Sequence, residues 1–403
     1  MKFRKNYLAK FVKYAKKVFN VEHGFGKMKD ERVNPKFKTS TVLLVVLIGL
    51  SLRVKSLNEL NYMIDENEFK NLFQKRAGFP RIDTIRDTIK VTDVKDLHDE
   101  IDFIIKTAVR NKVFANGTID GYTVAAVDGT KLFGSNKKSC PECLRNKGHN
   151  SHSCVAMAIV GNAPKLVVGF EMYKPKEDAF KKDEGEITAA KRLVTSVFER
   201  KNSFIDVLVY DSLMCNSIFI SHCLRYDVNV IIRAKQNNNN FVRQAKRITN
   251  KTEPIEVWGS DGEFEKVEVF ESEFNMPNVE QPLRFVKFAI KHLGEERTQI
   301  MLVTSCMEMK HRTLFKIMRA RADIENSIFN NLKKECSLGH CFVHGGNSVE
   351  VMTAMIFIAS NFMQLFYCRR LKKSVPTQRE LVRLLLKGLY SLEYDKELIL
   401  SSA

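Results

Sequence analysis

Two aspartates follow apolar runs that have the composition of buried strands. Asp128 ends the run in "TVAAVDGT", and Asp211 ends the run in "DVLVYDS". By the two-residue period of a strand, each aspartate shares a face with apolar side chains before it. We predict that both lie at the carboxyl ends of strands, where α/β sheets usually place functional sites. For either aspartate alone, an ordinary turn after a buried strand is the alternative.

A third carboxylate, Glu325, lies in a predicted helix over residues 311–335. Apolar residues at spacings of three and four form a broad stripe on this helix, and Arg321 and Glu325 are the charged residues on it. Because desolvating an unpaired carboxylate costs several kcal/mol, Glu325 needs a partner. One interpretation is an ion pair with Arg321 that only orients the helix. The other is convergence with Asp128 and Asp211 on two Mg²⁺ ions about 4 Å apart, which suits phosphodiester chemistry.

A second group of metal-binding residue types lies in "SCPECLRNKGHNSHSC" (139–154), between the first two predicted strands. The Cys-x2-Cys pair and the histidines behind it have the spacing of a zinc site. We predict that Cys140, Cys143, His149 and His152 bind a structural zinc ion, and that Cys154 begins a strand. A polar hairpin with incidental cysteines is the alternative.

The composition bounds the class of protein. The chain has 403 residues, of which 44% are hydrophobic, and its net charge of +18 favours a polyanion, with nucleic acid ahead of an anionic membrane surface. Nine cysteines without a signal peptide suit a reducing compartment, so we expect a cytoplasmic, nucleoid-associated protein.

Two apolar runs, 41–52 and 349–367, are interpreted as core helices. The first is too short to cross a bilayer, and Glu350, Asn361 and Gln364 interrupt the second.

The periodicity of the apolar residues changes along the chain. A helical region begins with a basic helix within residues 1–20, which is a candidate DNA contact. Three consecutive strands and then alternating helices and strands follow, and this order describes a mixed α/β sheet. We predict a helical region (1–117), the first part of an α/β core (118–240) and a β-rich region (241–309). A helix that returns to the core (310–345) and a C-terminal helical region (346–403) follow.

This order of elements resembles the ribonuclease-H-like core of DDE transposases from bacterial insertion sequences, over about residues 80–370. Asp128 in "DGT" and Asp211 in "VYDS" match the two aspartates of that family. The family also places a β-rich insertion between the second aspartate and the glutamate, which corresponds to residues 241–309.

The glutamate of the family lies in a box written Tyr, two residues, Arg, three residues, Glu, six residues, Lys. Arg321, three residues and Glu325 match the middle of this box. The sequence departs from it twice, because Met318 stands at the Tyr position and Lys333 follows Glu325 after seven residues. The second departure leaves a role for Lys333 open.

The resemblance implies that Asp128, Asp211 and Glu325 hold two Mg²⁺ ions and catalyse DNA cleavage and joining. The residues that it implies as DNA contacts are Lys131, Arg321, Lys333 and Trp258. The tryptophan would stack on a flipped base, and a place in the core is its alternative.

The partner implied by the resemblance is double-stranded DNA with terminal inverted repeats. The helical N-terminal region and the basic insertion would bind this DNA. We expect a homodimer on DNA, and we expect no association with a membrane. Two other functions stay open: a metal-dependent nuclease that cuts without joining, and a zinc-stabilised, non-catalytic DNA-binding regulator.

Overall fold

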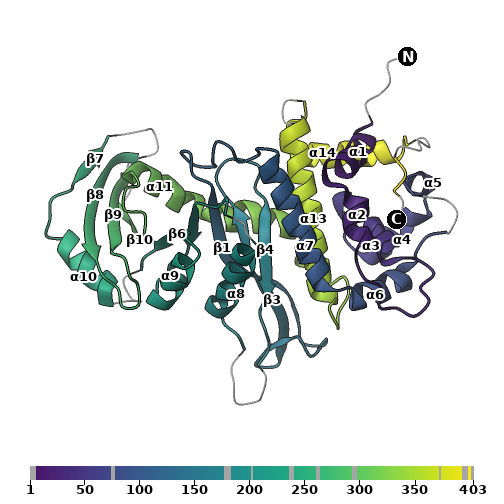
Figure 1. The fold of residues 1–403 in the computed structure, drawn as a ribbon, viewed down its shortest axis with the longest axis horizontal. Coiled ribbons are helices and arrows are strands. Elements are labelled where there is room, and N and C mark those ends of the chain that lie inside the picture. Colours follow the sequence, from purple (N-terminus) through teal and green to yellow (C-terminus); the bar gives the residue numbers. More distant parts are fainter. Residues whose placement is uncertain are drawn as a thin grey trace.

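The structure is a computed structural model that describes residues 6–73, 78–176, 183–200, 203–235, 240–259, 264–292, 297–371, 374–392 and 398–400. Within these residues the protein is a mixed α/β molecule with a ten-stranded sheet and flanking helices (Figure 1). This confirms the predicted fold class.

Strands β1 to β6 form the half of the sheet that was predicted as the core. Their bounds are Val124–Ser135, Leu144–Asn146, His149–Ile159, Val167–Met172, Val207–Tyr210 and Asn229–Arg233. Strand β1 pairs antiparallel with β3, which pairs antiparallel with β2 and β4. On its other side β1 pairs in parallel with β5, and β5 pairs in parallel with β6. This mixed order is consistent with a ribonuclease-H-like fold.

The β-rich region continues this sheet instead of forming a second one. Its strands β7 to β10 are Glu256–Trp258, Phe264–Phe274, Leu283–His292 and Arg297–Thr304. Strand β10 pairs antiparallel with β6, so the sheet runs without a break from β6 through β10, β9 and β8 to β7. Helix α10 (Asn240–Thr249) packs against β8 and β9. The domain boundaries at residues 241 and 309 stay predictions.

Helices cover the core strands on two sides. Helices α8 (Glu186–Glu199) and α9 (Ser217–Leu224) lie in front of the sheet in Figure 1, and α11 (His311–Ala320) lies behind it. The predicted helix over 311–335 is confirmed as one helical run. It consists of α11, a π-helical segment (Ile324–Phe329) and α12 (Asn330–Glu335). The π-helical segment packs against β1, and α11 packs against β6.

The N-terminal and C-terminal helices pack together at one end of the molecule (Figure 1). Helices α1 to α7 are Tyr7–Phe19, Val21–Gly26, Thr39–Ser51, Leu57–Asp65, Asn67–Lys70, Ile82–Val91 and Val94–Arg110. The later helices are α13 (Ser348–Phe366), its π-helical extension (Tyr367–Leu371) and α14 (Gln378–Leu389). Helix α13 contacts α3, α6 and α7, and α1 contacts α14. The predicted basic helix is α1, of which residues 1–5 lie outside the described part.

Helix α13 and its extension are long and apolar enough, by length and composition, to cross a membrane. Of the most apolar window in Ser348–Leu371, 78% is buried inside the protein. Asn361 is fully buried on this helix, and its amide group contacts the edge strand β4. Its Oδ1 accepts from the Val167 N–H (2.9 Å), and its Nδ2 donates to the Val167 carbonyl (2.8 Å). The polar residue that interrupts the apolar run therefore satisfies the backbone of an edge strand.

Replacement of Asn361 by alanine should destabilise the protein, because both backbone groups of Val167 would then be buried without a partner. Each unsatisfied group costs about 1–3 kcal/mol, so we expect the free energy of unfolding to fall by about 2–5 kcal/mol in urea denaturation. Gln364→Ala on the same helix is the control and should change it by less than about 1 kcal/mol. Equal effects of the two substitutions would contradict this role.

Candidate active site and Cys/His cluster

The parallel pairing of β1 with β5 brings Asp128 and Asp211 side by side. In the register of this pair, Ala126 lies opposite Val209, and the same offset places Asp128 opposite Asp211. Neighbouring strands lie about 4.8 Å apart, so the two aspartates belong to one site. The sequence prediction that two strand-borne aspartates meet at one edge is thus supported by the backbone register.

The prediction that Asp128 ends its strand is wrong in one detail. Strand β1 continues to Ser135, because the antiparallel strand β3 keeps pairing with it as far as Asn150. Strand β5 does stop at Tyr210, directly before Asp211. Asp128 therefore lies inside a long strand, at the point where its parallel neighbour ends.

Glu325 lies in the π-helical segment, and its side chain is 56% exposed. This corrects the prediction that it lies in the middle of a buried face. The buried member of the pair is Arg321, which is 10% exposed and whose Nη2 lies 3.4 Å from Glu325 Oε2. The buried guanidinium also lowers the pKa of Asp128 by its charge, and the glutamate side chain is open to solvent.

The carboxylates act on one another electrostatically. Burial, then the negative charges of Glu186 and Glu325, raise the pKa of Asp128, while Arg321 and the Gly129 N–H lower it. Together these effects bring the pKa to about 6. The Gly129 N–H donates to Asp128 Oδ1 at 3.0 Å. A charge-to-charge effect of Glu325 on Asp128 requires that the helix acid lies near the strand acid.

Two carboxylate oxygens in this site are buried without a hydrogen-bond partner among the described residues, Asp128 Oδ2 and Asp211 Oδ1. Buried acceptors are normally paired, and unpaired ones often mark an ion site. The other oxygen of the second aspartate, Asp211 Oδ2, lies 3.7 Å from Lys235 Nζ. The oxygen-only donor set fits Mg²⁺. Among the described residues the three predicted carboxylates do not meet as one cluster within 4.8 Å, so in this arrangement one ion could not be held by all three.

Glu186 is a fourth carboxylate of this site, and sequence reasoning missed it. It begins α8, and burial raises its pKa while the Gly129 N–H and the Tyr173 hydroxyl hold the pKa back. A Cβ atom at Gly129 would lie 2.3 Å from the Tyr173 hydroxyl and 2.9 Å from Glu186 Oε2. The glycine of "DGT" is therefore required by this close approach. In the sequence Glu186 looks like any acid in the first turn of a helix.

The π-helical segment explains the unusual spacing of Lys333. A π-helical turn contains one residue more than an α-helical turn. The seven residues between Glu325 and Lys333 therefore span the same rotation as six residues in a regular helix. Lys333 is exposed on α12, and its role as the lysine of the box stays a prediction.

The Cys/His cluster consists of Cys140, Cys143, His152 and His344, whose ligand atoms all lie within 4.8 Å of one another. The Cys140 and Cys143 sulfurs are 3.5 Å apart, and His152 Nε2 lies 3.4 Å and 3.3 Å from them. His344 Nε2 lies 3.5 Å from Cys143 Sγ and 3.3 Å from His152 Nε2. Burial lowers the pKa of His152 to about 4, so its imidazole is neutral near pH 7.

This geometry corrects one predicted zinc ligand, because His149 lies outside the cluster and His344 takes its place. His149 Nε2 lies 2.9 Å from Lys131 Nζ, and its Nδ1 lies 2.7 Å from Asn136 Oδ1. His149 thus positions Lys131. His344 is 192 residues from His152 in the chain, so no local spacing could have found it. Cys154 lies in the interior of β3 and is fully buried, so it is not a ligand, although β3 begins earlier than predicted.

The structure also corrects the stacking role predicted for Trp258. This residue is 4% exposed, and its ring packs against Phe288 and Phe315, with centroids 5.7 Å and 5.6 Å away. Its Nε1 donates to Glu256 Oε1 at 2.6 Å, and the Arg312 guanidinium covers the ring at 5.0 Å. Trp258 is therefore a core residue, as the alternative interpretation had it.

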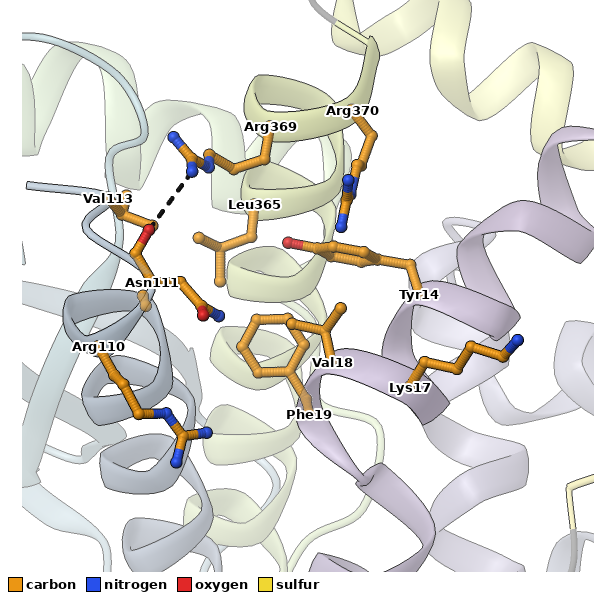
Figure 2. Close-up of a pocket in the computed structure, with 11 residues that line it drawn as sticks. Tyr14, Lys17, Val18, Phe19, Arg110, Asn111, Val113, Leu365, Arg369 and Arg370 are labelled. Atoms are coloured by element: carbon orange, nitrogen blue, oxygen red, sulfur yellow. Dashed lines mark hydrogen bonds between the residues drawn. The ribbon is translucent and has the colours of Figure 1, made fainter.

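A basic pocket of about 460 Å³ lies at the helical end of the molecule, between α1, α7 and the end of α13 (Figure 2). Its cationic lining residues are Lys17, Arg110, Arg369 and Arg370, and none of the described lining residues is acidic. Arg369 Nη2 donates to the Asn111 carbonyl at 3.4 Å, and the Arg370 guanidinium lies 5.4 Å from the Tyr14 ring. Uncompensated positive charge in a concavity favours a polyanion.

Comparisons with known proteins identify the family of this chain. The family model described as a transposase DDE domain matches residues 120–362, a range that contains the four carboxylates and the Cys/His cluster. No curated protein matches the sequence significantly. Among solved structures, endonuclease V from Bacillus subtilis is similar over 61% of this chain and 95% of its own, with 10% identity and a TM-score of 0.28. So low a score carries no argument about function.

Binding of Mg²⁺ should depend on pH through Asp128. Because the pKa of this carboxyl is raised to about 6, it is protonated at lower pH and must lose its proton when a cation binds. In isothermal titration calorimetry we expect affinity about tenfold weaker at pH 5 than at pH 7.5, with proton release near pH 6. Asp128→Asn should abolish the release, and Asp323→Asn should keep it, since Asp323 pairs with Lys165 instead. Binding without proton release near pH 6 would place Asp128 outside the ion site.

Proposed function

We propose that this chain, which belongs to the transposase DDE domain family, is a Mg²⁺-dependent DNA transposase. It would cleave the ends of a mobile element and join their 3′-hydroxyls to target DNA. The observation that carries the proposal is the site in which Asp128 and Asp211 face each other on parallel strands, each with an unpartnered buried oxygen. Glu325 completes the set from the helix.

The predicted triad would hold two Mg²⁺ ions, with Glu186 as an additional carboxylate at their edge. Bound there, the ions would lower the pKa of an attacking water or hydroxyl and stabilise the leaving oxygen of the phosphodiester. Arg321 contributes a fixed, buried positive charge beside the carboxylates, and this charge limits their mutual repulsion. Its place under Glu325 is better suited to orienting that carboxylate than to a long reach toward DNA.

Two exposed lysines, Lys131 and Lys333, are the candidates for DNA contacts near the site. Lys131 follows Asp128 on β1 and is oriented by His149, and Lys333 lies on the helix that carries Glu325. Both would contact DNA phosphates near the scissile bond as point charges. The two ring nitrogens of His149 contact Lys131 Nζ and Asn136 Oδ1, so the imidazole links the lysine to the loop after β1.

The DNA partner is proposed to extend beyond the carboxylates. The net charge of +18 and the basic pocket at the helical end support contacts of the N-terminal region with the terminal inverted repeats. Pairing of two ends would require a homodimer on DNA, acting in the cytoplasm at the nucleoid. A structural zinc ion in the Cys/His cluster is part of the same proposal, with His344 in place of His149.

Strand transfer is the decisive test of the catalytic proposal. A duplex from the DNA that flanks this gene, with a pre-cut 3′-hydroxyl end, should be joined to a plasmid in the presence of Mg²⁺. Loss of several kcal/mol of transition-state stabilisation in Asp128→Asn, Asp211→Asn or Glu325→Gln should lower the rate by about 10²-fold or more. Asp323→Asn is the matched control, because this neighbour of Glu325 faces Gly161 and Lys165. Cleavage without joining would favour the nuclease, and full activity of the triad variants would favour the regulator.

The basic pocket can be tested by DNA binding alone. Replacing Lys17, Arg110 and Arg369 by glutamine should weaken binding to duplex DNA. The slope of the logarithm of the binding constant against the logarithm of the salt concentration should become shallower by about 0.9 for each phosphate that is no longer neutralised. Fluorescence anisotropy at several salt concentrations measures both. Arg383→Gln is the control, because this exposed arginine is already paired with Glu380. An unchanged slope in the triple variant would show that DNA does not reach the pocket.

A further inference from the structure

We infer that the Cys/His cluster binds one zinc ion that clamps the chain segment after the Glu325 helix onto the strand that carries Asp128. The cluster draws its ligands from three places. Cys140 and Cys143 lie between β1 and β2, His152 lies on β3, and His344 lies in the segment of residues 336–347 between α12 and α13. The clamp is therefore a link between parts of the chain that local sequence does not connect.

The distances in the cluster fit a tetrahedral ion. Zinc bonds of about 2.3 Å to sulfur and about 2.0–2.1 Å to nitrogen give tetrahedron edges of ~3.8 Å for S···S, ~3.6 Å for S···N and ~3.3 Å for N···N. The observed separations are 3.5 Å for the sulfurs, 3.3–3.5 Å for three of the four sulfur–nitrogen pairs and 3.3 Å for the two nitrogens. The fourth sulfur–nitrogen pair, Cys140 and His344, lies within 4.8 Å. Shifts of roughly a few tenths of an ångström would seat the ion.

The ligand set and its surroundings point to a structural site. Two thiolates and two imidazoles fill all four positions of zinc, so no position is left for water or substrate. Cys140, Cys143 and His152 are buried, and the Phe133 ring lies against both imidazoles, 5.1 Å from His152 and 5.8 Å from His344. Phe133 belongs to β1, so the apolar wall of the ion site is part of the strand of Asp128.

The segment of residues 336–347 is held to β1 close to this ion site. Leu338 and Val343 are buried, and a Cβ atom at Gly339 would lie 3.3 Å from the Leu132 carbonyl. His344 is followed by two glycines with positive φ, which give the chain its turn into α13. A short irregular segment of this kind has no ladder of backbone hydrogen bonds to β1, so a bond from His344 to an ion on the hairpin would be its strongest attachment.

The clamp would also affect the position of Glu325 relative to Asp128. Only the catalytic meaning of that position rests on the proposed function. The same segment begins where the helix of Glu325 ends, at Glu335, and the clamp fixes that end against β1. Loss of the ion would free the helix end that places Glu325 relative to Asp128. Zinc bound outside the active site would thus help to fix the distance between the carboxylates of Glu325 and Asp128.

The experiment measures zinc content and hydrogen exchange of the full chain, without DNA or Mg²⁺. Wild-type protein should contain about one zinc per chain by elemental analysis, and His344→Ala and Cys143→Ser should lose it. The matched controls are His340→Ala, His149→Ala and Cys341→Ser, which should retain it. Amides of residues 311–347 should exchange faster in the two ligand variants and in chelator-treated protein, and zinc should restore their protection.

Several outcomes would overturn the clamp. Zinc-free wild-type protein, or zinc lost from His149→Ala but kept in His344→Ala, would refute the ligand set. Zinc loss without faster exchange in residues 311–347 would refute the clamp while leaving a zinc site. If the alanine and serine variants do not fold, His344→Cys supplies a thiolate in the same place and should keep both zinc and protection. Asp128→Asn should also keep both, which separates this inference from the fate of the transposase proposal.

Discussion

The parallel register of β1 and β5 is the constraint on which the candidate site depends. It sets two aspartates opposite each other on neighbouring strands, and burial together with the charges of Glu186 and Glu325 raises the pKa of Asp128 there. The protein offsets this locally with the buried Arg321 and the Gly129 N–H, and it leaves two carboxylate oxygens without a partner. A protein that merely needed a stable sheet edge would have no reason to retain such a pair. The unpaired charge is the physical argument for bound cations.

The unequal lengths of the neighbouring strands give the site its shape. Strand β5 stops at Tyr210, so the carboxylates are open on one side, whereas β1 continues to Ser135 with β3 beside it. The extended part of β1 carries Phe133 to the Cys/His cluster. The strand of Asp128 and the hairpin that carries Cys140, Cys143 and His152 are thus one continuous piece of backbone.

The remaining architecture separates the carboxylates from the basic pocket. The sheet extends beyond β6 into the β-rich region, where Trp258 is part of a packed aromatic core. At the opposite end the helices before and after the core pack around α13, whose buried Asn361 binds the edge of β4. This helical end carries the basic pocket. A positively charged pocket on a different part of the molecule from the carboxylates suits a long polyanion better than a small molecule.

The sequence by itself determined the features that depend on local periodicity. The helix over 311–335 and the order of strands and helices follow from spacings of two, three and four residues. Asp128 and Asp211 could be chosen for the same reason, because each follows an apolar strand pattern.

Only the tertiary structure decided which distant side chains meet. His344 replaces His149 in the Cys/His cluster, and Glu186 joins the carboxylates, although nothing in their neighbouring residues distinguishes them. The exposure of Glu325 and the phase of Lys333 depend on a π-helical segment that an α-helical period does not predict. Sequence patterns report the repeat of a local backbone, whereas these contacts are set by how sheets and helices pack across nearly the whole chain.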